Sequence, residues 1–378
     1  MRMPRRKFLG AAFLATALAC LLCSGFTAGA KAESEKLTVR VMTRNMDAGT
    51  DLLYVASATT EEGFAQAVLA TVNEVAASNI PGRAALLAAE VMATQPDLIA
   101  LQEVTTWRIP SETGTVVLDQ LELLQAALEA AGLHYRVAVK QQLTDIPVVI
   151  PEVSLNVRFT DHDVILVRSD LPPGQLDVIG TETHLYDLLL PFPVPGGSIP
   201  VLRGWIAVDA KIRGARFKFV TTHLESAVLG QPLPQAAYYQ LAQVIELLTA
   251  LQETELPVIL AGDFNSDAEN SGTGPDQTGT AALISSQGYT DAWRAVHLNP
   301  ADHGFTWPLF LEDPPLYDGL PLLCERIDLI FSAGPSPLSV ERTGLEPGLG
   351  GVYASDHAGV VATFSLENHR PDVPVRHR

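Results

Sequence analysis

Residues 257–267, PVILAGDFNSD, pass from an apolar run directly into a group of side chains that carry hydrogen-bonding oxygens. The run at 257–261 predicts a short strand buried on both faces, and Gly262 permits an unusual turn after it. Asp263 and Asn265 are two positions apart, so in an extended segment their side chains point to the same side. The segment is therefore either a strand that ends in an Asx-turn or part of a functional site.

The chain has 378 residues, which is long for one domain but within the size of large α/β domains. Hydrophobic residues make up 47% of it, which is enough for a sizeable core. The sequence contains no repeat of fixed period and no linker long enough to divide the body. We therefore expect one folded domain at residues 33–367, followed by a polar, basic tail at 368–378.

The first 32 residues have the features of an export signal. Basic residues at 2–7 precede an apolar run at 8–23, and small residues at 30–32 offer a cleavage site. The run is shorter than a typical membrane span of about 20 residues, and two adjacent arginines before it resemble a twin-arginine signal. We expect an exported protein, periplasmic or extracellular, in which cleavage leaves Cys324 as the only thiol.

The charge of the chain is strongly acidic. Its formal value is −18, and it becomes −23 without the first 32 residues, because that segment carries five basic residues and no acidic one. No cluster of Lys and Arg follows residue 32, whereas proteins that grip nucleic acid non-specifically usually present a basic stripe. This weakens a nuclease interpretation without excluding it, because carboxylates around divalent cations leave a site less negative than the formal charge suggests.

The spacing of apolar residues predicts both helices and strands. Helices are expected at 61–77, 82–94, 118–131 and 235–252. Strands are expected at 37–42, 98–101, 134–139, 163–168, 203–211, 216–222, 257–261, 325–331 and 359–364. We expect a looser, proline-rich region at 140–156 and a surface loop at 269–280.

Two apolar, proline-rich insertions, at 169–202 and 305–324, interrupt this pattern. Each is either a hairpin or loop packed on the body, or an exposed apolar lip for a lipid or another apolar ligand. The second alternative predicts transient contact with a membrane surface through 183–202 or 305–324.

Polar residues lie at the ends of several expected strands, which is where open α/β sheets place their chemistry. Glu103 directly follows an apolar run, which makes it a better ligand candidate than a glutamate in a polar segment. Asn45 and Asp47 repeat the two-residue spacing of Asp263 and Asn265. The complete set is Asn45, Asp47, Glu103, His223, Asp263, Asn265, Asp328, Asp356 and His357.

Six short motifs contain these residues: RNMD, LQEV, TTHLES, GDFN, ERIDLIF and SDH. Their order along residues 37–367 resembles the endonuclease/exonuclease/phosphatase superfamily, which has the deoxyribonuclease-like fold. The resemblance implies an α/β protein built as a four-layer α/β/β/α sandwich, with two mixed sheets flanked by helices. It also implies that the domain at 33–367 is catalytic and hydrolyses a phosphoester with the help of a divalent metal ion.

The resemblance assigns roles to five catalytic candidates. Asp263 orients or deprotonates the attacking water, and Asn265 holds this water or a phosphate oxygen. His357 binds the phosphate and assists the nucleophile or the leaving group, while Asp328 fixes the tautomer of His357 and stabilises its cation. His223 donates to the non-bridging oxygens. The structural alternative for Asp328 is an ion pair with Arg326 in the same strand. For His223 it is a histidine at the edge of a sheet whose hydrogen bonds are satisfied within the fold.

The metal candidates by the same resemblance are Glu103, Asn45, Asp47 and Asp356. These are oxygen ligands, which suit Mg²⁺, with Mn²⁺ or Ca²⁺ as alternatives. The sequence has no cluster of Cys or His at zinc spacing, so zinc is the poorer candidate. Asp47 is equally well explained as a structural residue, because the first strand varies after its Asn in this superfamily.

Two weaker signals complete the set. Arg158 and the acidic residues at 161–163 either support the phosphate-binding histidine or form a salt bridge beside a strand. Arg203 lies next to a Gly-Trp pair that belongs either to the mouth of the site or to the core.

The favoured interpretation is an exported, Mg²⁺-dependent phosphoesterase, and more narrowly a phosphodiesterase. A secreted endonuclease and a sphingomyelinase-like phospholipase are alternatives, so the expected partner is a phosphoester substrate, either nucleic acid or a phospholipid head group. A non-catalytic binding module on the same fold is an alternative from a different class. No stable protein partner is implied.

Overall fold

Two mixed β-sheets lie face to face in the computed structural model, which describes residues 37–150, 155–226, 233–309, 322–348 and 350–366. All of these residues belong to one compact unit, Lys36–Arg378. The expected export signal at 1–32, the tail at 368–378 and most of the insertion at 305–324 lie outside the described residues.

The first sheet has the strand order β15-β16-β1-β2-β6-β3-β4, with β5 paired to the other side of β6. Its strands are β1 (Leu37–Asn45), β2 (Leu98–Gln102), β3 (Thr106–Ser111), β4 (Gly114–Asp119), β5 (Tyr135–Ile150), β6 (Leu155–Arg168), β15 (Ser336–Thr343) and β16 (Gly359–Leu366). The second sheet has the order β13-β14-β12-β11-β10-β7. Its strands are β7 (Leu176–Leu185), β10 (Gly204–Ile212), β11 (Ala215–His223), β12 (Val258–Asp263), β13 (Thr290–Asp291) and β14 (Asp328–Ala333).

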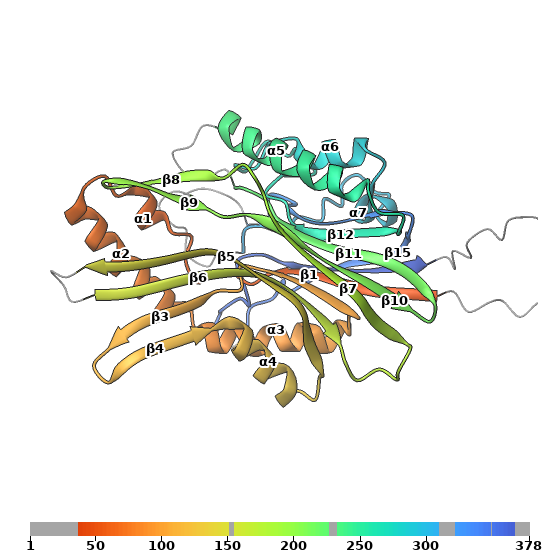
Figure 1. The fold of residues 1–378 in the computed structure, drawn as a ribbon, viewed down its shortest axis with the longest axis horizontal. Coiled ribbons are helices and arrows are strands. Elements are labelled where there is room, and N and C mark those ends of the chain that lie inside the picture. Colours follow the sequence, from red (N-terminus) through yellow and green to blue (C-terminus); the bar gives the residue numbers. More distant parts are fainter. Residues whose placement is uncertain (1–36, 151–154, 227–232, 310–321, 349, 367–378) are drawn as a thin grey trace, which may run out of the picture. The chain divides into compact units, whose positions relative to one another are not determined.

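Helices cover the outer face of each sheet (Figure 1). Apolar residues alternate along the strands, so one set, such as Val41 and Phe219, fills the space between the sheets. The opposite set packs on α3 (Ile80–Thr94) and α4 (Gln120–Ala130) at the first sheet, and on α5 (Leu233–Leu251) and α6 (Thr280–Ser286) at the second. This arrangement confirms the expected four-layer α/β/β/α sandwich.

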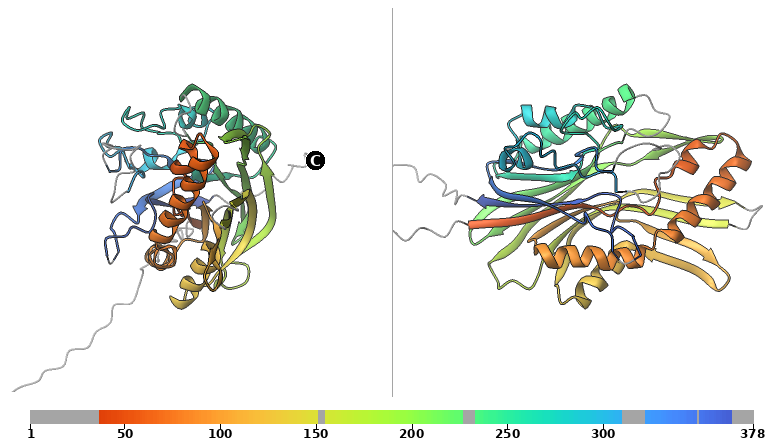
Figure 2. Two further views of the ribbon diagram at one scale, coloured as in Figure 1. Left: turned by 90° about the vertical axis from the view of Figure 1, so that its left-hand side faces the viewer. Right: turned by 180° about the vertical axis from the view of Figure 1, so that it is seen from behind.

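The remaining elements lie around this sandwich. They are α1 (Leu53–Ser57), α2 (Glu61–Ala77), α7 (Ala292–Val296) and the hairpin of β8 (Leu190–Val194) with β9 (Gly197–Val201). In Figures 1 and 2, α1 and α2 are orange-red and lie at the end of the molecule where β8–β9 and the β5–β6 pair project. Within the described residues, no helix is long and apolar enough to cross a membrane.

The expected helices agree with α2, α3, α4 and α5 to within two residues at each end. The looser region expected at 140–156 is wrong in its first part, because β5 continues to Ile150 and pairs with β6 along most of its length. Pro147 explains the wrong expectation, because proline is rare in the interior of a sheet. This residue lies on β5, an edge strand, where the missing N–H breaks no ladder on the open side.

Two further expectations also need correction. The strand expected at 325–331 begins only at Asp328, so this residue starts β14 instead of ending a strand. The insertion at 169–202 contains β7, which belongs to the second sheet, and the β8–β9 hairpin. Leu190 and Tyr186 of this insertion are buried, which favours the interpretation of a hairpin packed on the body.

Candidate active site

The polar strand ends meet at one edge shared by both sheets. β1 and β2 run parallel and end together at Asn45 and Gln102, one residue before Glu103. β11 and β12 also run parallel and pair His223 with Asp263 at their last residues. β14 is antiparallel to β12, so its first residue, Asp328, pairs with Asp263. The start of a strand thereby contributes to the same edge as the ends of its neighbours.

Asp263 uses its two carboxylate oxygens differently. Oδ1 accepts the backbone N–H of Asn265 at 2.9 Å, which is the Asx-type bond expected after Gly262. Oδ2 faces the site, 3.0 Å from Nδ2 of Asn45. Burial raises the pKa of Asp263 to about 6, although the neighbouring His357 acts in the opposite direction. The Asx-turn and the functional site are therefore one structure.

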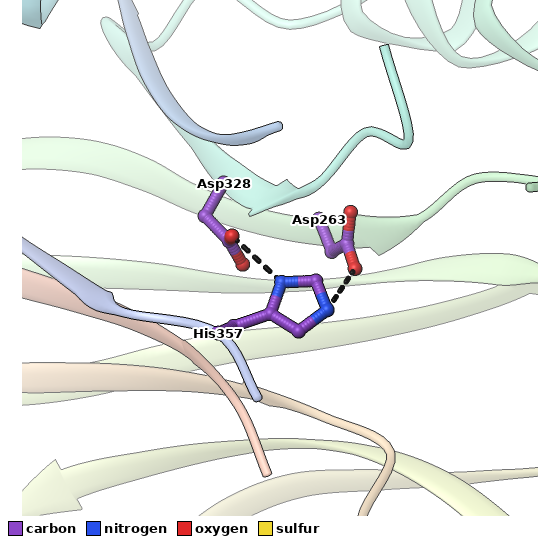
Figure 3. Close-up of side chains that lie close together, drawn as sticks. All are labelled: Asp263, Asp328 and His357. Atoms are coloured by element: carbon purple, nitrogen blue, oxygen red, sulfur yellow. Dashed lines mark hydrogen bonds and ion pairs between the residues drawn. The ribbon is translucent and has the colours of Figure 1, made fainter. Parts of the chain in front are cut away.

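His357 lies between two carboxylates (Figure 3). Its Nδ1 is 2.8 Å from Oδ2 of Asp328, and its Nε2 is 3.8 Å from Oδ2 of Asp263. Burial alone lowers the pKa of a histidine, but the charges of Asp328, Asp356 and Asp263 outweigh it and raise the pKa of His357 well above its usual value. The surrounding carboxylates thus favour a cationic ring, which donates to Asp328 from Nδ1 and has Nε2 at ion-pair distance from Asp263.

His223 has a different partner. Nη1 of Arg203 lies 2.7 Å from Nδ1 of His223, and a guanidinium can only donate, so Nδ1 is the acceptor. The ring proton is then on Nε2, which lies 3.6 Å from Oδ2 of Asp263. Burial, followed by the charge of Arg203, lowers the pKa of His223 well below its usual value. His223 is therefore a neutral donor that points into the site.

Asn265 adopts a left-handed backbone conformation with φ of 45°. Its side-chain Nδ2 donates to the carbonyl of Leu224 at 2.9 Å. The residue therefore fixes the Asp263 carboxylate through its backbone and the end of β11 through its side chain.

Glu103 and Asp356 form the acidic side of the site. Glu103 accepts the backbone N–H of Ala48 at 2.7 Å and Nδ2 of Asn45 at 3.1 Å. Its pKa is raised by burial and then by the charges of Asp356 and Asp47. Burial also raises the pKa of Asp356, to about 6. These half-buried carboxylates thus repel one another in a space that a cation would stabilise.

Asp47 is held to one side of this group. Its Oδ2 lies 3.0 Å from Nη1 of Arg83, and its Oδ1 accepts the backbone N–H of Gly49 at 2.6 Å. One oxygen is therefore engaged by α3 and the other by the loop that follows β1. The placement fits a residue that shapes the metal site more closely than it fits a direct ligand.

Two groups of side chains meet the chemical needs of a metal ion. Ligand atoms of Asp263, Asp328 and His357 all lie within 4.8 Å of one another, so this group could hold a metal. Glu103 and Asp356 offer only oxygen atoms, the donor set that Mg²⁺ prefers. The second set fits better, because Nδ1 of His357 is already engaged by Asp328 and the raised pKa favours a protonated ring that cannot ligate.

The alternatives for Asp328 and Arg158 are resolved by their contacts. Arg326 pairs with Glu269 and Asp291, each at 2.7 Å, and so leaves Asp328 to His357. Arg158 pairs with Asp145 across β5 and β6 at 2.5 Å, as expected for a salt bridge beside a strand. His357 is thus supported by neither Arg326 nor Arg158.

Arg203 is the contributor that the sequence identified least clearly. It precedes Gly204, which pairs with His223 in the register of β10 and β11, and this register brings the guanidinium to the histidine ring. Three buried carboxylates surround it, those of Asp161, Asp163 and Glu225, and burial raises the pKa of Asp161 to about 7. The signal in the sequence was the adjacent Gly-Trp pair, for which the mouth of the site was one of two interpretations.

The amino-acid sequence matches the Endonuclease/Exonuclease/phosphatase family over residues 76–357, more than half of the chain. The chain therefore belongs to this family, as its motifs indicated, and has the fold of the family's phosphoesterases with a group that could hold a metal ion. The match begins after β1, so the place of Asn45 and Asp47 in the site rests on the structure alone.

Two solved structures of TDP2 from D. rerio support the same fold, and a third structure is also similar. A humanized TDP2 from D. rerio is 18% identical, with a TM-score of 0.52 over 86% of this chain and 98% of that one. D. rerio TDP2 complexed with a single-strand DNA product is also 18% identical, with a TM-score of 0.50 over the same shares. An endonuclease/exonuclease/phosphatase from Beutenbergia cavernae DSM 12333 is 22% identical, with a TM-score of 0.49 over 88% of this chain and 72% of that one. No curated protein matches the chain.

Proposed function

We propose that the protein is an exported, Mg²⁺-dependent phosphodiesterase. The observation that supports this most directly is the environment of Oδ2 of Asp263. Among the described residues no backbone N–H donates to this oxygen. It lies within 4 Å of ring nitrogens of both His223 and His357, and it belongs to a carboxyl group with a pKa of about 6. A base with a pKa near the working pH is well suited to take a proton from water.

Each side chain has a defined task in this proposal. Oδ2 of Asp263 takes one proton from the attacking water, and the water oxygen forms the new bond to phosphorus. The ester P–O bond breaks, and the leaving oxygen takes the proton from Nε2 of His357, whose charge Asp328 stabilises. The neutral Nε2–H of His223 donates to a non-bridging oxygen, where negative charge grows in the transition state.

Glu103 and Asp356 would hold the metal ion, with Asn45 bridging Glu103 to Asp263 and Asp47 supporting the loop. A bound divalent cation would neutralise charge on the phosphoryl group and at the leaving oxygen. Mg²⁺ is proposed first because the donors are carboxylate oxygens, and Mn²⁺ or Ca²⁺ could take its place.

Export is proposed from the sequence of residues 1–32, and it places the protein in a periplasm or outside the cell. Sequencing the N-terminus of protein recovered from each cell fraction tests this. An intact residue 1 in protein that stays with the cytoplasmic fraction would contradict it.

A separate test addresses membrane contact through 183–202. Vesicle binding by the wild type that is lost on deleting 186–197 would support this contact.

The reaction is tested with bis-p-nitrophenyl phosphate. We expect purified protein to hydrolyse it with Mg²⁺ or Mn²⁺ and to stop when a chelator is added, with Asp263→Asn as the inactive control. Plasmid DNA, RNA, sphingomyelin vesicles and phosphomonoesters, assayed side by side, then distinguish the secreted endonuclease and phospholipase alternatives. Absence of hydrolysis at every pH and with every metal would leave a binding module on the same fold.

A further inference from the structure

A largely apolar cavity of about 240 Å³ lies beside the candidate active site. Three parts of the chain form its walls: α1 and α2, the β5–β6 pair, and the β8–β9 hairpin, which meet at one end of the molecule (Figures 1 and 2). The cavity is larger than an engineered apolar cavity of about 150 Å³ that binds benzene. It can therefore accommodate a hydrocarbon group of appreciable length.

The walls carry apolar side chains that the protein itself does not fully cover. Val55 and Phe64 from the helices, Ile146 from β5, and Phe192 and Ile199 from the hairpin all line the cavity, and each is only half-buried. Because they line the cavity, part of their apolar surface borders its open space. A hydrocarbon ligand would remove this apolar surface from water.

One end of the cavity is polar and lies next to the active site, with which it shares Glu103. Glu103, the proposed metal ligand, lines it, and so do Arg203, Asp161 and Glu225. Arg203 contacts His223 through Nη1, so a single residue borders both the cavity and the reacting centre. A molecule with its phosphate at Asp263 could extend directly into the apolar part.

Several polar atoms at this end have no partner among the described residues. They are Oδ1 of Asp161, Nε of Arg203 and Oε2 of Glu225, and the side chains of Asp161 and Glu225 are more than nine-tenths buried. Buried polar atoms are normally hydrogen-bonded, because leaving them unpaired costs free energy. Unpaired buried groups therefore lie beside the polar end, which distinguishes it from a closed apolar core.

We propose that this cavity binds a hydrocarbon chain of the substrate, and that the substrate is an amphiphilic phosphoester with one such chain. The inference rests on the proposed function, because it assumes that the phosphate lies at Asp263 and His357. The cavity volume of about 240 Å³ is sufficient for one such chain. Its polar end suits the polar group that joins such a chain to the phosphate.

The test uses methyl, butyl and octyl p-nitrophenyl phosphates below their micellar concentrations. We expect kcat/KM of the wild type to rise with chain length, by up to about fourfold for each methylene that becomes buried. Ile146→Trp should fill the cavity and lower the octyl-to-methyl ratio at least tenfold. Val149→Trp is the matched control, because Val149 lies on the same strand, is 64% exposed and does not line the cavity.

Ile199→Trp fills the cavity from the β8–β9 hairpin and serves as the second variant if Ile146→Trp folds poorly. A ratio near one in the wild type, or a ratio that both tryptophan variants leave unchanged, would overturn the inference.

Binding gives a readout that does not depend on catalysis. In calorimetric titrations with a chelator present, octyl phosphate should bind wild type at least tenfold more tightly than methyl phosphate, and Ile146→Trp should abolish this preference. Equal affinities would overturn the chain site. Hydrolysis of all esters without a chain preference refutes only the cavity inference, whereas chain-selective binding without hydrolysis refutes only the proposed reaction.

A second pair of substrates distinguishes a membrane lipid from a soluble amphiphile as the source of the hydrocarbon chain. Hydrolysis of lysophosphatidylcholine embedded in vesicles identifies a membrane lipid, and hydrolysis of the submicellar octyl ester alone identifies a soluble amphiphile. Both results require the same cavity.

Discussion

The two histidines of the site occupy almost equivalent places and have opposite chemistry. Both are buried, and their Nε2 atoms lie 3.6 Å and 3.8 Å from the same oxygen of Asp263. The difference is the residue at Nδ1, which is Asp328 for His357 and Arg203 for His223. The pKa of His357 is accordingly raised and that of His223 lowered.

This comparison shows that the partner, more than burial, decides the charge of a buried histidine. Burial lowers the pKa in both cases, yet the carboxylates around His357 reverse the outcome, whereas Arg203 reinforces it. The proposed base is therefore flanked by one cationic and one neutral donor. The cation can give up a proton to a leaving group, and the neutral ring can only share its proton.

Removing the cationic histidine, His357, or the proposed base, Asp263, should have the largest effect on the reaction rate. We expect His357→Ala and Asp263→Asn each to lower the hydrolysis rate of bis-p-nitrophenyl phosphate by at least about a hundredfold, the scale of acid–base groups. The measurement is kcat at saturating Mg²⁺, with thermal unfolding as a check that both variants fold. A rate within a factor of a few of wild type would remove the residue from the reaction.

Removing Arg203, which contacts the neutral His223, should have an intermediate effect on the reaction rate. Arg203→Met keeps an apolar stem but removes the donor at Nδ1 of His223, so the ring is free to change tautomer and point an acceptor into the site. We expect a rate about tenfold lower, the scale of one hydrogen bond to a charged group. Nitrogen NMR of the His223 ring should report the loss of the Nε2–H tautomer. An unchanged tautomer together with an unchanged rate would refute the positioning role.

The two sides of the site were not equally predictable from the sequence. Asp263, His357 and Asp328 lie in short motifs whose order is informative, so the sequence identified all three. The pairing of Asp263 with Asp328 depends on the antiparallel register of β12 and β14, which are distant in the chain. Arg203 has no motif of its own, and only the register of β10 and β11 brings it to His223.

The fold shows the same division. Helices such as α2 were predictable because their apolar spacing is local. Strands were expected at 134–139 and 163–168, but the continuation of β5 to Ile150 was missed because Pro147 argues against a strand, although an edge position tolerates it. The cavity combines α1, α2, β5, β6 and β8–β9, so the sequence indicated only the apolar character of one wall, at 183–202.

The pH dependence of stability should separate the histidines by sign. The pKa of His223 is lower in the folded protein than in the unfolded chain, where it is about 6.5, so its contribution to stability is lost as pH falls through that value. The pKa of His357 is raised, so its contribution is present at low pH and is lost as pH rises through its folded value.

His223→Asn removes the first of these terms and keeps an oxygen that can accept from Arg203. Measured with a chelator, the Tm of this variant relative to wild type should improve by a few degrees between about pH 7.5 and about pH 5.5. A relative Tm that does not depend on pH would show that the ring of His223 is not held neutral. Direct NMR titration of both rings then identifies which assignment fails.

The smallest effect is expected at Arg158, the matched control for Arg203. For both arginines the sequence left two interpretations open, which included support for the phosphate-binding histidine at Arg158 and the mouth of the site at Arg203. Arg158, however, lies at the surface and pairs with Asp145 across β5 and β6. Exposed ion pairs contribute little, because water screens them and two long side chains must be ordered. Arg158→Met should therefore leave kcat and KM unchanged while Arg203→Met lowers the rate. Equal losses in both variants would mean that positive charge near the site matters and that the contact with Nδ1 of His223 does not.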